Sequence, residues 1–129
     1  MRELTLRICR DGLPDTEMIL SALMERERLC STGIGDEVAI PHAKIKGLAS
    51  LSAAFGRSGK GVDFHSMDNK PVKWIFLLLA SDSSATVHLK ALARISRLMK
   101  SKGLRERMEN ASSSAELYSL LKEEDERLG

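Results

Sequence analysis

A histidine that directly follows a proline is the most chemically suggestive feature of the sequence. His42 ends a run of residues, 31–42, that starts with a turn containing Gly33 and Gly35 and continues with a short apolar segment. Pro41 fixes its own φ and biases the preceding residue toward extended geometry, so we expect the imidazole to be presented in a defined direction at the end of a strand. Open α/β sheets usually carry their chemistry there, which makes His42 the leading candidate for a reactive group.

The glycine turn before this histidine is a candidate ligand-binding loop. Gly33 and Gly35 tolerate backbone angles that other residues resist, so the turn can be tight and its amide groups can face a ligand. The imidazole itself is a good nucleophile near neutral pH, because at an unperturbed pKa of ~6.5 its neutral form is well populated. The local spacing alone also allows a purely structural turn residue at position 42.

The composition predicts one compact globular domain spanning residues 1–129. The chain is 43% hydrophobic and 29% charged, with a formal net charge of +2 and interspersed signs, so nucleic-acid binding is not implied. No apolar run approaches the ~20 residues that span a bilayer, and no secretory signal is visible, which predicts a cytoplasmic protein without membrane insertion. Cys9 and Cys30 lack metal or redox spacing and are expected to be small buried residues.

Periodicity and turn residues predict an alternation of helices and strands. Helices are expected at residues 4–9, 17–28, 86–100, 104–108 and 114–121, and strands at 38–40, 51–55 and 71–80. The near-continuous apolar run at 71–80 is typical of a strand covered on both sides. Glycines at 56–61 predict a turn, and Gly103 predicts a helix stop. The expected fold is a small layered α/β domain with a mixed or parallel central sheet flanked by helices on both faces.

A second histidine falls on the inner face of the amphipathic helix at 86–100. His88, Leu92, Ile95 and Met99 share one stripe, and basic residues fall opposite. His88 would lie in the first helical turn, where the positive end of the helix dipole disfavours protonation. Because its stripe is otherwise apolar, a satisfied core histidine is an alternative.

The order and spacing of five short motifs carry a family resemblance. These motifs are Arg26-Glu27, Ser-Thr-Gly-Ile-Gly at 31–35 followed by Val-Ala-Ile-Pro-His-Ala at 38–43, Val62-Asp63-Phe64, Asp68-Asn69-Lys70-Pro71-Val72, and His88-Leu89-Lys90-Ala91-Leu92. Together they resemble the enzyme IIA domain of the phosphoenolpyruvate-dependent sugar phosphotransferase system, in its fructose/mannitol class (type 2). That class includes the nitrogen-regulatory enzyme IIA proteins. Members usually begin with a further segment of roughly twenty residues, which this sequence is expected to lack.

The resemblance implies a phosphoryl carrier that needs no cofactor and no metal. His42 matches the histidine that accepts a phosphoryl group from the phosphocarrier protein HPr, and Arg26 and His88 match the residues that stabilise this group. A guanidinium fork suits phosphate oxygens, and Gly33 and Gly35 are candidate phosphate-loop donors. If these contacts were too strong, the phosphohistidine would be trapped and its phosphoryl group would not pass to the next carrier. Contacts of moderate strength are therefore expected.

Other interpretations of these residues remain open. An alternative for Arg26 is a simple ion pair with a neighbouring carboxylate on the helix surface, and His65 is expected to be an ordinary loop residue. The three histidines fit no short metal-ligand motif. Asp63 and Asp68 have turn-like surroundings, so turn hydrogen bonds are favoured over a hydrolytic carboxylate pair.

Three functions follow from the resemblance. The first is a nitrogen-regulatory carrier whose phosphorylation state controls docking to a regulated target protein. The second is a fructose/mannitol transport component that passes phosphate to an enzyme IIB. The third is an interaction domain that is never phosphorylated. The sequence predicts no oligomeric state.

Overall fold

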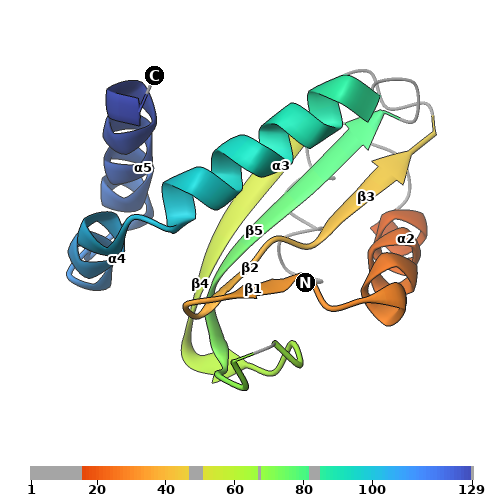
Figure 1. The fold of residues 1–129 in the computed structure, drawn as a ribbon, viewed down its shortest axis with the longest axis horizontal. Coiled ribbons are helices and arrows are strands. Elements are labelled where there is room, and N and C mark those ends of the chain that lie inside the picture. The colour runs from red at the N-terminus through yellow and green to blue at the C-terminus, as the bar shows by residue number, and fades with distance from the viewer. Residues whose placement is uncertain (1–15, 47–50, 67, 82–84, 129) are drawn as a thin grey trace. The chain divides into compact units, whose positions relative to one another are not determined.

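The computed structural model describes residues 16–46, 51–66, 68–81 and 85–128 (Figure 1). The helix predicted at 4–9 and Cys9 lie outside these residues. The chain divides into two compact units, residues 1–92 and 93–129, which are described separately. The single domain expected from the sequence stays a prediction.

A mixed sheet organises the first unit, as predicted. Its central strand, β5 (Val72–Ser81), pairs in parallel with β2 (Val38–Ala39) and β3 (His42–Ile45) along one edge and antiparallel with β4 (Ser52–Val62) along the other. A short strand, β1 (Gly33–Gly35), pairs antiparallel with β2. The predicted strand at 71–80 is therefore confirmed as the centre of the sheet, and its residues Trp74, Leu77 and Leu79 are fully buried.

Helices cover both faces of this sheet. The helix α2 (Thr16–Leu29) packs on one face in a core cluster with β3 and β5, made of Ile19, Leu23, Ala43, Ile45, Leu77 and Leu79. Successive side chains of a strand point to opposite faces, so His42 and Lys44 point away from α2. They face the first turns of α3 (Ala85–Met99), which carry His88. The predicted α/β layered fold is thus confirmed.

Two strand predictions need correction. The strand predicted at 38–40 ends at Ala39, and a further strand that the sequence analysis missed begins at His42 itself. His42 is therefore the first residue of β3 and lies three residues after the last residue of β2. The predicted turn at 56–61 is also wrong, because β4 continues to Val62. β4 pairs with β5 up to Arg57 and again at Val62. The register of the pairing shifts between these two residues, in the part of the strand that contains Gly59 and Gly61.

The second unit holds the rest of α3 together with α4 (Lys102–Glu109) and α5 (Ser114–Leu128). Gly103 does not stop a helix, because it lies inside α4, whose cap is Ser101: the Ser101 hydroxyl accepts a hydrogen bond from the Leu104 amide. The terminal helix is longer than the predicted 114–121. No helix in the described part of the chain is long and apolar enough to cross a membrane.

Candidate functional site

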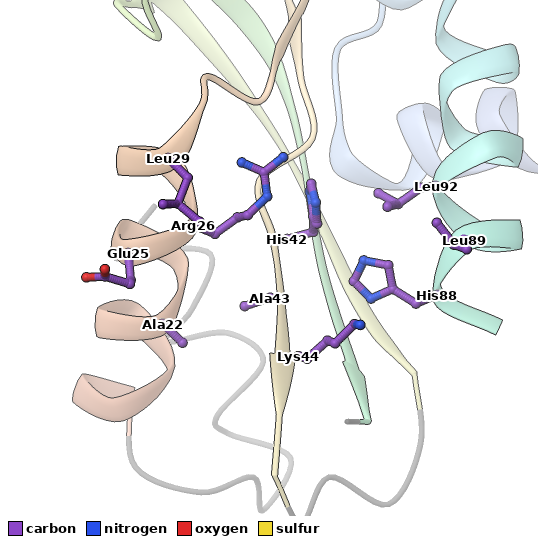
Figure 2. A pocket seen from close by; sticks show the side chains of 10 residues that line it. All are labelled: Ala22, Glu25, Arg26, Leu29, His42, Ala43, Lys44, His88, Leu89 and Leu92. Atoms are coloured by element: carbon purple, nitrogen blue, oxygen red, sulfur yellow. The ribbon is translucent and has the colours of Figure 1, made fainter. Parts of the chain in front are cut away.

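An open pocket of about 470 Å³ lies between α2, β3 and the start of α3 in the first unit. Figure 2 shows the side chains that line it: Ala22, Glu25, Arg26, Leu29, His42, Ala43, Lys44, His88, Leu89 and Leu92. Three residues predicted from the sequence, His42, His88 and Arg26, are brought together here. Gly33 and Gly35 are not among the lining residues.

The backbone that leads into His42 is held in place. The Ile40 amide donates to the carbonyl of Thr32 at 3.0 Å, and the Leu78 amide of β5 donates to the carbonyl of Pro41 at 2.9 Å. The ring is fixed as well, since Nδ1 of His42 lies 2.8 Å from the carbonyl oxygen of Ile40. A carbonyl only accepts, so Nδ1 carries the proton in the neutral ring and Nε2 keeps its lone pair. The geometry thus leaves Nε2 as the nucleophilic atom.

His88 places a second imidazole beside the first. The two ring centroids are 5.3 Å apart, with an interplanar angle of 67°. The His88 residue is only 4% exposed, and its Nδ1 atom is buried without a hydrogen-bond partner in the described part of the chain. An unsatisfied buried polar atom is unfavourable, so Nδ1 of His88 is a buried ring nitrogen that the described residues leave without a partner.

Both imidazoles are kept neutral. Burial is the main cause that lowers the pKa of His42; the positive charge of Arg26 lowers it further, whereas the Ile40 hydrogen bond and Glu27 act in the opposite direction. Burial also lowers the pKa of His88, followed by the charges of His42 and Lys44. A neutral His42 is the form that can attack an electrophile at physiological pH.

Arg26 lies at the carboxyl end of α2 with its guanidinium directed toward the His42 ring (Figure 2). Its Nη1 donates to the carbonyl of Cys30 at 2.9 Å, which satisfies one of the free carbonyls beyond the helix. This contact is with a backbone carbonyl and not with a neighbouring carboxylate, the alternative considered from the sequence. Other guanidinium N–H groups remain for an anion in the pocket. Cys30, predicted to be buried, is exposed, because the chain leaves α2 there.

Glu27, noted only as part of a motif, shapes the approach to the site. Its carboxylate accepts from the backbone amide of Thr32 at 2.9 Å and also from the Thr32 hydroxyl. These bonds fix the connection from α2 to β1, and the carbonyl of Thr32 then accepts from Ile40. Arg26 therefore lines the pocket, whereas Glu27 fixes the backbone that connects α2 to β1.

The two glycines of the predicted phosphate loop have steric reasons for their identity. A Cβ on Gly33 would lie 2.0 Å from the Oγ of Ser66, and the Gly33 amide already donates a hydrogen bond to the Ser31 hydroxyl at 3.0 Å. Gly35 has a φ of +88°, which other residues rarely adopt. The structure thus places both in the β1–β2 hairpin and away from the pocket that holds His42.

The remaining candidates are turn residues. His65 is exposed, with its side chain 88% accessible, and lines a different hollow together with Asp63. The Asp63 carboxylate accepts from the His65 amide at 2.8 Å, and the Asp68 carboxylate accepts from the amides of Asp36 and Lys70, both at 3.1 Å. The predicted turn hydrogen bonds of these two aspartates are confirmed.

Lys44 is a pocket residue that the sequence analysis missed. It lies two residues after His42 on β3, so both side chains share one face of the strand. The alternation of side chains along a strand that starts at His42 could have indicated that Lys44 shares its face. The sequence analysis predicted no strand at 42–45 and therefore did not use this alternation.

A comparison with protein-family models decides the family. The model described as "Phosphoenolpyruvate-dependent sugar phosphotransferase system, EIIA 2" matches residues 1–124. The chain belongs to this family. It is thus related to components of a phosphotransferase system, which gives it a coarse role in phosphoryl transfer.

Individual relatives of this EIIA 2 chain carry two kinds of name. A nitrogen regulatory protein of Bradyrhizobium diazoefficiens is 39% identical over 103 residues, which cover 80% of this chain and 67% of the relative. A fructose-specific EIIA component of Haloferax volcanii is 35% identical over 120 residues, 93% of this chain and 78% of the relative. The crystal structure of the nitrogen regulatory protein IIA-Ntr from Neisseria meningitidis matches with a TM-score of 0.87 and 33% identity, covering 93% of this chain and 82% of that one.

Proposed function

We propose that the chain is a phosphohistidine carrier in which Nε2 of His42 accepts a phosphoryl group from an HPr-type phosphocarrier protein. The observation that supports this best is the pairing of two imidazoles, 5.3 Å apart, in an open pocket that Arg26 also lines. Histidine suits a carrier because its N-phosphoryl bond is readily transferred again.

The transfer conserves atoms and electrons without a cofactor. The P–N bond of the donor phosphohistidine breaks, and its electron pair returns to the donor ring nitrogen. The lone pair on Nε2 of His42 forms the new P–N bond, while the proton on Nδ1 stays in its hydrogen bond to Ile40. Such a loose transition state needs mainly alignment and positive or hydrogen-bonding groups around the phosphoryl oxygens.

His88 and Arg26 provide those groups in this proposal. A neutral His88, whose ring lies beside that of His42, donates a ring N–H to a phosphoryl oxygen. Arg26 adds a permanent charge while one of its nitrogens stays bound to Cys30. Leu29 and Leu89, 78% and 66% exposed, form an apolar rim on which the phosphocarrier docks.

Intact-mass measurement after incubation with phospho-HPr tests the proposal. The wild-type chain is expected to gain one phosphoryl group, and His42→Ala is expected to gain none. His65→Ala is the matched control, because this histidine is exposed and lies outside the pocket. An unmodified wild-type mass would favour an interaction domain that is never phosphorylated, and label on His42→Ala would overturn the assignment of the acceptor.

Of the two carrier roles, we propose the nitrogen-regulatory one, in the cytoplasm, with a regulated protein as the downstream partner. The similarity to nitrogen regulatory proteins supports this. The alternative, a fructose/mannitol-type component that hands its phosphate to an enzyme IIB, is supported by the fructose-specific relative. Adding purified enzyme IIB of the fructose class to the phosphorylated chain separates them: rapid loss of phosphate to enzyme IIB would favour sugar transport.

A further inference from the structure

Lys44 is the one lysine among the described residues that line the pocket. Its neighbours on the strand, Ala43 and Ile45, are buried in the core cluster under α2, so the alternation of β3 commits Lys44 to the face shared with His42. Figure 2 shows its amine end reaching toward the His88 ring, on the side of the imidazole pair away from Arg26. The two imidazoles therefore lie between two cations.

The charged side chains of the pocket differ in how they are engaged. Arg26 donates to the carbonyl of Cys30 at 2.9 Å, and Glu25 pairs with Arg28 at 2.9 Å. Lys44 is exposed and forms no hydrogen bond or ion pair with another residue in the part of the chain that the structure describes. An ammonium group on a flexible four-carbon stem can follow a moving anion, whereas a guanidinium anchored to a helix end stays where it is.

We propose that Lys44 is a further phosphoryl-contacting residue, which attracts the incoming phosphoryl group and aligns its oxygens as the group moves onto His42. This inference rests on the proposed carrier function. A phosphoryl group carries two negative charges, and its equatorial oxygens gain charge in a loose transition state, so a mobile cation at the open side of the pocket lowers the barrier to transfer. Burial is the main cause that lowers the pKa of His88, and the charges of His42 and then Lys44 lower it further.

The test compares Lys44→Met, Lys44→Arg and the control Lys46→Met in the full chain. Lys46 is exposed and follows β3, and it does not line the pocket. We expect Lys44→Met to slow the second-order rate of transfer from phospho-HPr by about tenfold, the size of one charge-assisted hydrogen bond, and to weaken its dependence on salt. Lys44→Arg should recover most of the rate, and Lys46→Met should behave as the wild type.

A second measurement works without any phosphoryl donor. Histidine C–H resonances followed by NMR should show His88 titrating at higher pH in Lys44→Met than in the wild type, and unchanged in Lys46→Met. If the wild type accepts phosphate and Lys44→Met accepts it equally fast, the inference is overturned while the carrier function stands. If the wild type accepts none, the carrier function fails, and the inference fails with it; an unshifted His88 would additionally show that Lys44 does not reach that ring.

Discussion

The Nδ1 atom of His42 lies 2.8 Å from the carbonyl oxygen of Ile40, two residues earlier, in the connection between β2 and β3. This contact decides which ring nitrogen can react. As a P–N bond forms at one nitrogen, the ring becomes positively charged, and a hydrogen bond from the other nitrogen to a carbonyl becomes stronger. The carbonyl of Ile40 therefore stabilises the phosphorylated ring more than the free one.

The phosphoryl group is accordingly expected on Nε2 and not on Nδ1. Uniformly ¹⁵N-labelled protein phosphorylated with phospho-HPr should show the nitrogen shifts of an Nε2-linked phosphohistidine, with the Nδ1 proton still protected from exchange. Linkage at Nδ1 would require the bond to Ile40 to break and would contradict this geometry.

Phosphate acceptance should persist into mildly acidic solution. Burial, assisted by the charge of Arg26, lowers the pKa of His42, so its neutral, nucleophilic fraction stays high below pH 6.5, where an ordinary imidazole is half protonated. The rate of transfer from phospho-HPr is expected to be flat from pH 7.5 to ~6.5 and to fall only below that value. A decline that begins above pH 7 would argue against a lowered pKa; the pH dependence of HPr itself needs a parallel control.

The same shifts predict how stability depends on pH. In the unfolded chain His42 and His88 bind protons near pH ~6.5, whereas in the folded chain they bind them only at lower pH. The unfolded state thus holds more protons just below 6.5, and the free energy of unfolding must fall as the pH drops through this range. Urea denaturation at several pH values should show a shallower acid loss for His88→Gln than for the wild type. If the unfolding free energy fell equally steeply with pH in both proteins, burial would destabilise the protonated form of His88 only slightly.

Arg26→Lys should impair the carrier although it keeps the charge. A lysine cannot donate to Cys30 and to a phosphoryl oxygen in the same planar fork. We expect the amount of phosphohistidine at equilibrium with phospho-HPr to fall several-fold, about the effect of one charged hydrogen bond. Arg28→Lys is the matched control, because Arg28 is on the same helix and exposed, and its ion pair with Glu25 is of a kind worth at most ~1 kcal/mol. Equal behaviour of the two variants would remove Arg26 from the site.

Gly33→Ala should destabilise the fold for a packing reason and leave the chemistry intact in the molecules that fold. The added Cβ would lie 2.0 Å from Oγ and 3.0 Å from Cβ of the buried Ser66. A loss of about 1–3 kcal/mol in the free energy of unfolding is typical of such overpacking. Gly59→Ala meets nothing within 4 Å and should change stability by less than ~0.5 kcal/mol. The double variant Gly33→Ala with Ser66→Gly should recover part of the loss; if it does not, the cause is not this contact.

The sequence analysis succeeded where a single strong pattern decided the outcome. The apolar run at 71–80 could only be a covered strand, and the helical stripe of α3 put His88 on the inner side, where it meets His42. Motif spacing, not local periodicity, selected Arg26.

The errors arose where tertiary pairing overrode local preference. Glycines in 56–61 indicated a turn, yet β5 pairs with Gly56 and Arg57 and, after a register shift, with Val62, so the strand continues. Pro41 signalled the end of a strand, yet the next residue pairs with the same neighbour again, so β3 and its Lys44 were missed. The sequence could not reveal the steric role of Gly33, because Ser66, which occupies the space that a side chain would need, lies thirty-three positions away.

The proline interruption between β2 and β3 has a consequence for how such a carrier works. Thr32 and Leu78 bind the backbone of Ile40 and Pro41, so the segment leading into His42 is anchored before any phosphoryl group is bound. In the proposed carrier, phosphorylation and dephosphorylation of His42 would then require no rearrangement of this segment of the main chain. Such a fixed backbone would favour neither acceptance nor donation of the phosphoryl group. The direction of transfer would then depend on how far the donor and recipient proteins are phosphorylated.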